Sequence, residues 1–144
     1  MIHIEYFTFN AFMERCSVVW DDDVNCAIID PGFYTVGERD TLYGFIENKG
    51  LCVKAILLTH GHFDHIGGVD AILKLKKVPV YIHEKDAHML TDTVQNLSAA
   101  LGGFRFTATP ADQRLNDGDA FMGFRVIHTP GHSFGSICLY NEEE

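Results

Sequence analysis

Basic residues are scarce in this chain. Eleven lysines and arginines stand against twenty acidic residues, which gives a formal net charge of −9. The only basic cluster is Lys74, Lys76 and Lys77, and we interpret it as the solvated face of a helix. Because a negatively charged protein repels phosphate backbones at long range, the composition argues against nucleic acid as a partner.

Long apolar runs are missing as well. No run in the chain approaches the length that a membrane-spanning helix needs. The N-terminus shows neither the basic region nor the apolar region of a secretory signal. A hydrophobic fraction of 47% and a charged fraction of 22% are typical of a globular protein. We therefore expect a cytoplasmic protein with no membrane partner.

The chain also lacks a C-x-x-C motif. Its four cysteines are widely spaced, at Cys16, Cys26, Cys52 and Cys138. The last three stand in apolar runs, where a free thiol behaves as a small hydrophobic side chain. This pattern favours a reducing compartment, although the even number of cysteines leaves a disulfide open.

The length of 144 residues suits one domain with a core and is too short for two of ordinary size, so we expect a single domain over residues 1–144. Alternating or apolar runs predict strands at Ile2–Phe9, Cys16–Trp20, Cys26–Ile29, Val53–Leu58, Val80–His83, Phe124–His128 and Ser136–Tyr140. Helical spacing predicts helices at Arg39–Asn48, with Asp40 or Thr41 as the cap, at Val69–Lys77 and at Glu84–Leu90. This succession predicts an α/β layered fold. We expect Thr91–Thr109 to be a loop that acts as a lid or as part of a substrate wall.

The stretch Thr59–Gly68 concentrates the side chains that bind metals. It holds His60, His62, Asp64 and His65, directly after an apolar run that predicts a buried strand. Imidazole and carboxylate are the ligands that zinc prefers where no thiolate is at hand, and a turn at a rigid strand end can aim several of them at one point. The stretch predicts a metal site. The alternative is a polar turn that happens to be rich in histidine.

A second motif, Thr129-Pro130-Gly131-His132, follows the strand predicted at Phe124–His128. With this motif and the H-x-H-x-D-H pattern of Thr59–Gly68, the chain resembles the metallo-β-lactamase-fold hydrolases. The resemblance extends over essentially the whole chain. It implies an αββα sandwich and metal-dependent hydrolysis.

The resemblance also implies a role for each motif residue. His60, His62 and His132 would hold one cation, and Asp64 with His65 would begin a second site. Three neutral imidazoles leave the first ion its charge and an open position, so the pKa of a bound water falls towards ~7. Asp64 would be the catalytic residue that handles the proton of this water. We expect one or two zinc ions, with iron or manganese as alternatives.

Two parts of the family pattern do not occur in the chain. No Gly-Asp pair, which would supply a bridging carboxylate, and no further histidine follow His132. We therefore expect a C-terminally truncated sandwich with a complete first site and a second site that is partial or empty. An exposed sheet edge in such a structure would favour self-association.

Among the branches of the family, the chain is most similar to hydroxyacylglutathione hydrolases of the glyoxalase II type. The segments Ile29-Asp30-Pro31-Gly32 and Tyr81-Ile82-His83-Glu84 carry this similarity together with the two motifs. It implies a small-molecule substrate, a thioester such as S-lactoylglutathione. The alternatives are the lactamase and phosphodiesterase branches, an iron oxygenase similar to persulfide dioxygenases, and a metal-binding module without activity.

Asp30 stands at the end of a predicted strand and has two interpretations. Its carboxylate accepts the free ring N–H of a ligating imidazole and fixes the tautomer, or it bonds backbone amides in the Pro31-Gly32 turn. Thr59 is a candidate to tether the loop through its hydroxyl. We interpret the remaining histidines as structural; they are His3, His83, His88 and His128.

Overall fold

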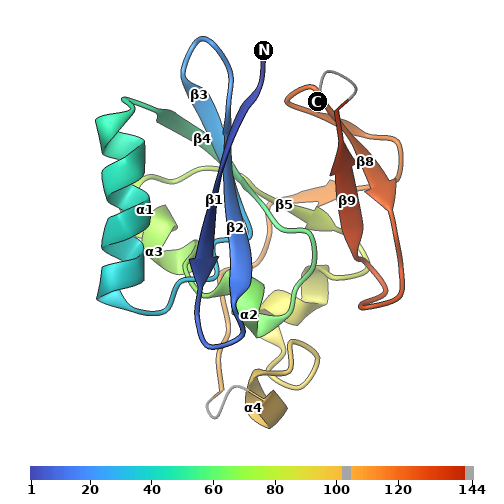
Figure 1. Ribbon diagram of the computed structural model, residues 1–144. Helices are drawn as coiled ribbons and strands as arrows, with labels where there is room; N and C mark the ends of the chain where they lie inside the picture. Colours follow the sequence, from blue (N-terminus) through green and yellow to red (C-terminus); the bar gives the residue numbers. More distant parts are fainter. Residues whose placement is uncertain (102–104, 142–144) are drawn as a thin grey trace.

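The structure is a computed structural model that describes residues 1–101 and 105–141 (Figure 1). Its larger sheet contains, in spatial order, β1 (His3–Phe9), β2 (Glu14–Trp20), β3 (Asn25–Ile29), β4 (Cys52–Leu57), β5 (Val80–His83) and β6 (Gln113–Leu115). Its smaller sheet contains β7 (Ala120–Phe121), β8 (Phe124–His128) and β9 (Ile137–Tyr140). The first three strands of the larger sheet are antiparallel, and β3 to β6 are parallel.

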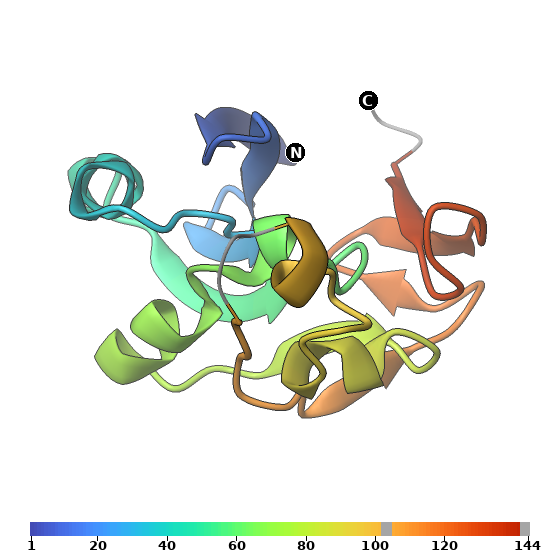
Figure 2. The same ribbon diagram turned by 90° about the horizontal axis from the view of Figure 1, so that it is seen from below.

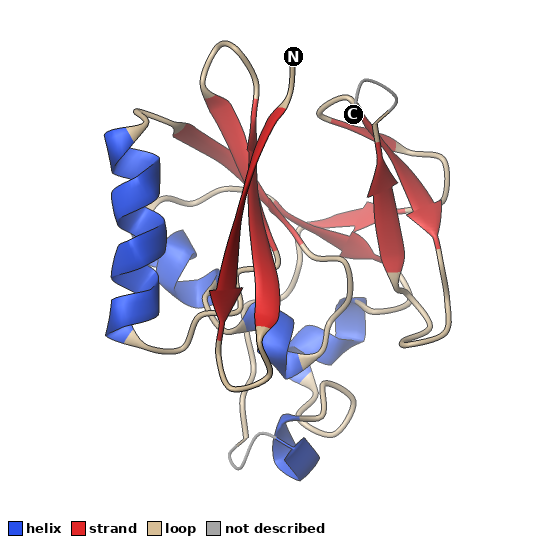
Figure 3. Cartoon of the chain, viewed as in Figure 1, coloured by secondary structure: helices blue, strands red, loops and turns tan. Residues whose placement is uncertain are grey.

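The helices are α1 (Val36–Asn48), α2 (Phe63–Ile66), α3 (Val69–Leu75), the 3-10 helix η1 (Ala87–Thr91) and α4 (Ser98–Leu101). In two views at right angles, α1 and α3 lie on one side of the larger sheet and the smaller sheet lies on the other (Figures 1 and 2). Figure 3 shows the same order with helices and strands distinguished. The predicted α/β layered fold is confirmed.

The layers follow from the alternation of side chains along the central strands. Ile28 and Ile56 belong to a buried cluster with Leu42 of α1. Leu57, the next residue in β4, belongs to a second cluster with Val126 of β8. Because neighbouring residues of a strand point to opposite faces, one continuous apolar strand supplies both cores.

The first helix begins earlier than the sequence pattern predicts. Thr35 is the N-cap, and its side chain accepts the backbone N–H of Glu38. The Glu38 carboxylate in turn accepts the backbone N–H of Thr35, which completes a capping box. The prediction that Asp40 or Thr41 caps this helix is therefore wrong, because the helix starts well before Leu42, its buried apolar residue.

Two further segments differ from the predicted pattern. The turn of helix expected over Glu84–Leu90 is the 3-10 helix η1, and the helix expected over Val69–Lys77 ends at Leu75. The expected loop at Thr91–Thr109 contains α4, and residues 102–104 of it lie outside the described residues. Among the residues that the structure describes, no helix is long and apolar enough to cross a membrane.

Candidate metal centre

Three imidazoles from two distant segments meet beside the larger sheet. His60 and His62 lie in the loop that follows β4, and His132 lies in the loop between β8 and β9. Nδ1 of His62 is 3.0 Å from Nε2 of His132. The ring centroid of His60 is 4.9 Å from that of His62 and 4.8 Å from that of His132. One nitrogen from each of the three rings lies within 4.8 Å of the others, so a single ion could contact all three.

The protonation state of these rings suits a cation. His60 is buried, and its Nε2 has no hydrogen-bond partner among the described residues. Burial, followed by the neighbouring His65, lowers the pKa of His60 to about 3. Burial, followed by His132, also lowers the pKa of His62. Neutral imidazoles with an unpaired buried nitrogen are what a zinc-type ion requires, so the residues present fit the metal that the sequence predicts.

Asp64 and His65 form a second, smaller group. Both lie on the short helix α2, directly after His62, and Oδ2 of Asp64 is 3.6 Å from Nε2 of His65. Together with His60 they form another cluster that could hold an ion. This cluster shares His60 with the first, so within the described chain the second site has fewer ligands of its own.

Asp30 holds this helix to the loop before it. Its Oδ1 accepts the backbone N–H of Thr59 at 2.8 Å, and its Oδ2 accepts the Thr59 hydroxyl at 2.5 Å. Nδ1 of His65 is 3.1 Å from Oδ2 of Asp30. The Asp30 carboxylate thus pairs with the His65 ring and not with the amides of the Pro31-Gly32 turn, where the N–H of Gly32 bonds the main-chain oxygen of Asp30 at 2.8 Å. That His65 is a metal ligand stays a prediction. The tether through the Thr59 hydroxyl is present as expected.

The contact with Asp30 fixes which ring nitrogen of His65 remains free. Burial opposes protonation of His65, but the hydrogen bond to Asp30 and the charge of that carboxylate outweigh burial and raise the pKa of His65. Nδ1 faces Asp30 at 3.1 Å, and Nε2 faces Asp64 at 3.6 Å. This orientation is the one that a ligating histidine needs.

Sequence reasoning missed Glu14. Its side chain is fully buried at the start of β2, with Oε1 3.3 Å from Nδ1 of His65. Burial, followed by Asp30, raises the pKa of Glu14 to about 10. Glu14 is therefore a neutral acid near pH 7 in the metal-free protein. No local motif marks it, because its neighbours lie far along the chain.

Of the remaining histidines, His3, His83 and His128 belong to none of these clusters, and His88 lines a groove beside His62 and His132. His83 and His128 stack on each other, with ring centroids 4.1 Å apart and planes at 15°, and so connect β5 to β8. His3 stacks on Trp20 and contacts Asp22. The interpretation of these rings as structural agrees with these contacts.

A groove of about 340 Å³ opens beside the first cluster. It is lined by His62, Lys85, Asp86, His88, Met89, Gln95, Leu97, His132, Ser133 and Phe134. Two of these residues, Gln95 and Leu97, belong to Thr91–Thr109, the segment that the sequence predicts to be a lid or a substrate wall. The groove therefore joins the candidate ligands to a mixed apolar and basic surface.

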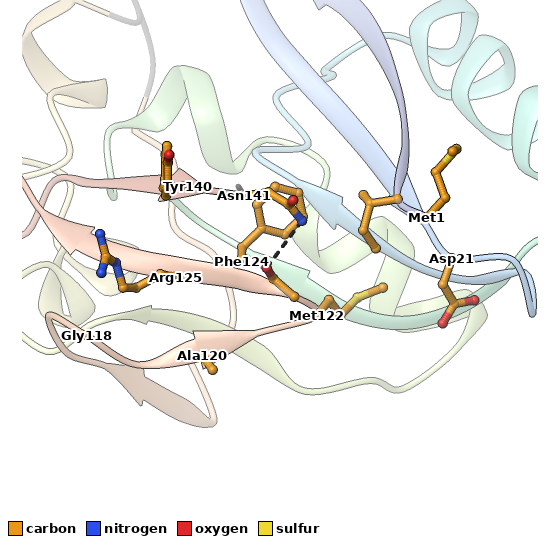
Figure 4. A pocket seen from close by; sticks show the side chains of 11 residues that line it. Met1, Asp21, Gly118, Ala120, Met122, Phe124, Arg125, Tyr140 and Asn141 are labelled. Carbon is orange, nitrogen blue, oxygen red and sulfur yellow. Dashed lines mark hydrogen bonds between the residues drawn. The ribbon is translucent and has the colours of Figure 1, made fainter. Parts of the chain in front are cut away.

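A larger pocket of about 680 Å³ lies at the other end of the strands (Figure 4). It is lined by Asp21 after β2 and by Arg125 and Tyr140 at the outer ends of β8 and β9. Glu14 and His132 lie at the opposite ends of these same strands. The pocket is therefore remote from the histidine cluster and contains none of the candidate ligands.

The arrangement of two motifs on an α/β layered fold defines a class. Residues 10–144 match the Metallo-beta-lactamase superfamily. The chain belongs to this superfamily, and it carries the fold of metal-dependent hydrolases.

Particular relatives refine this class. The chain is 42% identical over 122 residues to "Probable metallo-hydrolase YqgX" of Bacillus subtilis, which covers 82% of this chain and 56% of that protein. It is 31% identical to "Hydroxyacylglutathione hydrolase GloC" of Haemophilus influenzae, over 99% of this chain and 68% of that protein. The chain thus spans between about half and two thirds of the length of these relatives.

Two solved structures are similar to the chain. The BLEG-1 B3 metallo-beta-lactamase superimposes with a TM-score of 0.87 and 38% identity, over 98% of this chain and 68% of that one. The structure of TTHA1623 in a di-iron-bound form superimposes with a TM-score of 0.80 and 32% identity, over 96% of this chain and 67% of that one. One of these two structures is described as di-iron-bound, so the similarity supports a metal in this fold without specifying which one for this chain.

Proposed function

We propose that this chain carries the metal centre of a hydrolase that cleaves small thioesters of the hydroxyacylglutathione type. The single observation that supports this most strongly is the meeting of His60, His62 and His132 around one point. The similarity to a hydroxyacylglutathione hydrolase over 99% of the chain favours the thioester branch. The proposal concerns the protein that contains these 144 residues.

In this proposal the three imidazoles hold the first cation, and Asp64 with His65 contributes to a second. A divalent cation in such a site supplies a water of lowered pKa, ~7, and polarises the acyl oxygen of the substrate. We favour zinc, with iron and manganese as the alternatives, because imidazole suits all three and geometry alone does not separate them.

The chain's own residues have defined tasks. The low pKa of His60 keeps that ring neutral and available as a ligand at physiological pH. The side chain of Asp64 is 22% exposed. Its carboxylate can take a proton at Oδ2 from the water that attacks the acyl carbon, and it can then deliver this proton to the departing thiolate. Asp30 fixes the ring of His65, so that the Asp64 side of that ring stays free.

The groove beside His62 and His132 would bind the rest of the substrate. Met89, Leu97 and Phe134 offer apolar surface, and Lys85 offers a positive charge. A hydroxyacylglutathione presents carboxylates, which Lys85 would attract, beside a short hydroxylated acyl group and the methylene groups of the glutathione, so its chemistry matches such a mixed surface.

A thiol-release assay on the metal-loaded protein tests the proposal. We expect turnover of S-lactoylglutathione, and a loss of at least about 100-fold in kcat/KM for His132→Ala, because loss of a ligand removes the cation. His3→Ala, a histidine outside the centre, is the matched control and should leave turnover unchanged. Absence of thioester turnover in the loaded protein would overturn the proposal.

β-Lactam hydrolysis is a second candidate. It is favoured by the TM-score of 0.87 with BLEG-1, which is described as a B3 metallo-beta-lactamase. The same protein preparation should be given a chromogenic β-lactam. Cleavage of the β-lactam without cleavage of the thioester would assign the chain to the lactamase branch. Ferrous-dependent oxygen uptake would indicate an oxygenase instead.

A further inference from the structure

Asp86 lies outside both metal-binding motifs, and the proposed chemistry gives it no task. It follows β5 and precedes η1, and only 1% of the residue is exposed. A carboxylate buried to this degree is costly unless its oxygens are hydrogen-bonded. Its partners therefore indicate what it does.

One carboxylate contacts both loops that carry the imidazoles. Oδ2 of Asp86 accepts the backbone N–H of Gly61 at 3.0 Å and the hydroxyl of Ser133 at 2.6 Å. Oδ1 accepts the backbone N–H of Gly135 at 2.7 Å. Gly61 stands between His60 and His62, and Ser133 directly follows His132. Asp86 thus bonds each loop next to its candidate ligands.

The two loops have few other direct links. Among the hydrogen bonds of the described residues, the main-chain N–H of Ile137 donates to the oxygen of Thr59 at 2.9 Å. This bond lies at the base of the loop, five residues beyond His132. Nearer the ligands, Nδ1 of His62 and Nε2 of His132 lie 3.0 Å apart and can share one N–H···N hydrogen bond, which an ion bound to either nitrogen would replace. Beside this ring contact, the hydrogen bonds that link the two loops near the ligands are those of Asp86.

Close packing supports the same connection. A Cβ at Gly135 would lie 2.6 Å from Oδ1 of Asp86, and a Cβ at Gly61 would lie 3.1 Å from its main-chain oxygen. Any side chain at Gly135 would therefore displace the carboxylate. The absence of side chains at these two positions allows both loop backbones to reach Asp86.

We propose that Asp86 is a positioning residue that fixes His132 relative to His60 and His62 and thereby sets the affinity of the first metal site. It acts through the loop backbones and touches no ligand atom. The inference rests on the proposed metal centre.

Cobalt titration of the metal-free protein tests this role, because the visible spectrum of Co²⁺ reports ligand geometry apart from any activity. Asp86→Asn keeps the shape but turns an N–H₂ group towards backbone donors. We expect Co²⁺ to bind about 10- to 100-fold more weakly with an altered spectrum, as is usual when a partner behind the ligands is lost. Circular dichroism should show that the variant is folded.

The matched control is Asp112→Asn. Asp112 accepts the backbone N–H of Val80 at 3.2 Å, and it contacts neither loop. This variant should bind Co²⁺ as the unmodified protein does. Equal affinity and an identical spectrum for Asp86→Asn would contradict the role of Asp86.

Ser133→Ala keeps the test decisive if Asp86→Asn does not fold. This change removes one of the three hydrogen bonds and leaves the carboxylate in place. We expect Co²⁺ binding to weaken several-fold, and unchanged binding would contradict the inference. Failure of the metal centre itself would look different, because the unmodified protein would then bind no Co²⁺.

Discussion

At the scale of single residues, the centre depends on buried acids as much as on histidines. Asp30 orients His65, and Asp86 bonds both ligand loops. Glu14 contacts the same ring nitrogen of His65 as Asp30 does. One ring N–H cannot bond two ionised carboxylates at full strength, so Glu14 is the acid whose ionisation is suppressed.

The first prediction concerns this suppression in the metal-free protein. Burial and Asp30 raise the pKa of Glu14 from 4.5 to about 10. The folded state then keeps a proton that the unfolded chain releases, so this contribution to stability is complete below pH 4.5 and is lost as the pH rises towards 10. Glu14→Gln cannot ionise. The stability of the variant relative to the unmodified protein should therefore rise between pH 5 and pH 8, by up to about 4 kcal/mol, because each pH unit in this window corresponds to about 1.4 kcal/mol.

Urea unfolding at the two pH values measures this difference. Glu5→Gln is the control, because Glu5 is an exposed residue of the neighbouring strand β1. It should leave the pH dependence of stability unchanged. If Glu14→Gln also left it unchanged, the buried acid would not be neutral in the folded protein.

The candidate site residues that could be predicted from the sequence are those that stand at a fixed spacing within a short motif. His60, His62, Asp64 and His65 stand within a few positions of one another, so the pattern itself is visible. Glu14 and Asp86 had no such signal, because each acquires its role from residues that lie 16 or more positions away. The assignment of the motif residues as metal ligands stays a prediction.

At the scale of elements, the start of α1 connects the helix to the sheet. The Glu38 carboxylate closes the capping box, and it also accepts the backbone N–H of Asn10 at 2.5 Å and of Tyr34 at 3.0 Å. The Asn10 side chain donates to the main-chain oxygens of Gly32 and Asp64. The helix N-terminus thus supports the turn between β1 and β2 and, through it, the loop that carries α2.

The second prediction concerns this cap. Thr35→Ala removes the hydroxyl that accepts from Glu38, and we expect the free energy of unfolding to fall by about 1 kcal/mol. Thr41→Ala is the matched control. Its hydroxyl bonds the main-chain oxygen of Gly37 on the exposed side of the same helix, so the change should stay within about 0.5 kcal/mol. Equal losses for the two variants would show that the cap adds no stability.

The beginning of α1 shows why element boundaries are harder to predict than elements. The periodic apolar residues of this helix start at Leu42, whereas Val36 in its first turn is exposed, so periodicity alone places its beginning too late. The order Thr35-Val36-Gly37-Glu38 is itself the signal for a capping box, and it precedes these periodic positions. The strands were more readable, because β-branched and apolar runs between turn residues coincide with β3, β4 and β5.

At the scale of the whole molecule, the two motifs meet because the C-terminal end of β4 lies beside the loop of the β8–β9 hairpin. The loop after β4 carries His60, and the hairpin loop between β8 and β9 carries His132. The sequence predicts the order of these elements. It does not by itself predict that the smaller sheet packs against the larger one through Val126 and Leu57. The alternation of apolar residues along a strand shows that one face is buried, but it does not show which element covers that face.

The third prediction concerns the effect of metal on the whole fold. An ion that binds only the folded state stabilises it, by about 2.7 kcal/mol at one hundred times its dissociation constant. We expect the zinc-loaded protein to melt roughly 5–15 °C higher than the protein treated with a chelator. His132→Ala should show little of this shift. A single cooperative transition would agree with the prediction that residues 1–144 form one domain.

The central claim is that His60, His62 and His132 bind one common ion. Anomalous diffraction at the zinc edge, from crystals of the protein grown with zinc, tests it most directly. We predict an anomalous peak within about 2.0–2.1 Å of one ring nitrogen of each of the three residues. A map with no peak between these rings, or with the ion bound elsewhere, would contradict the claim.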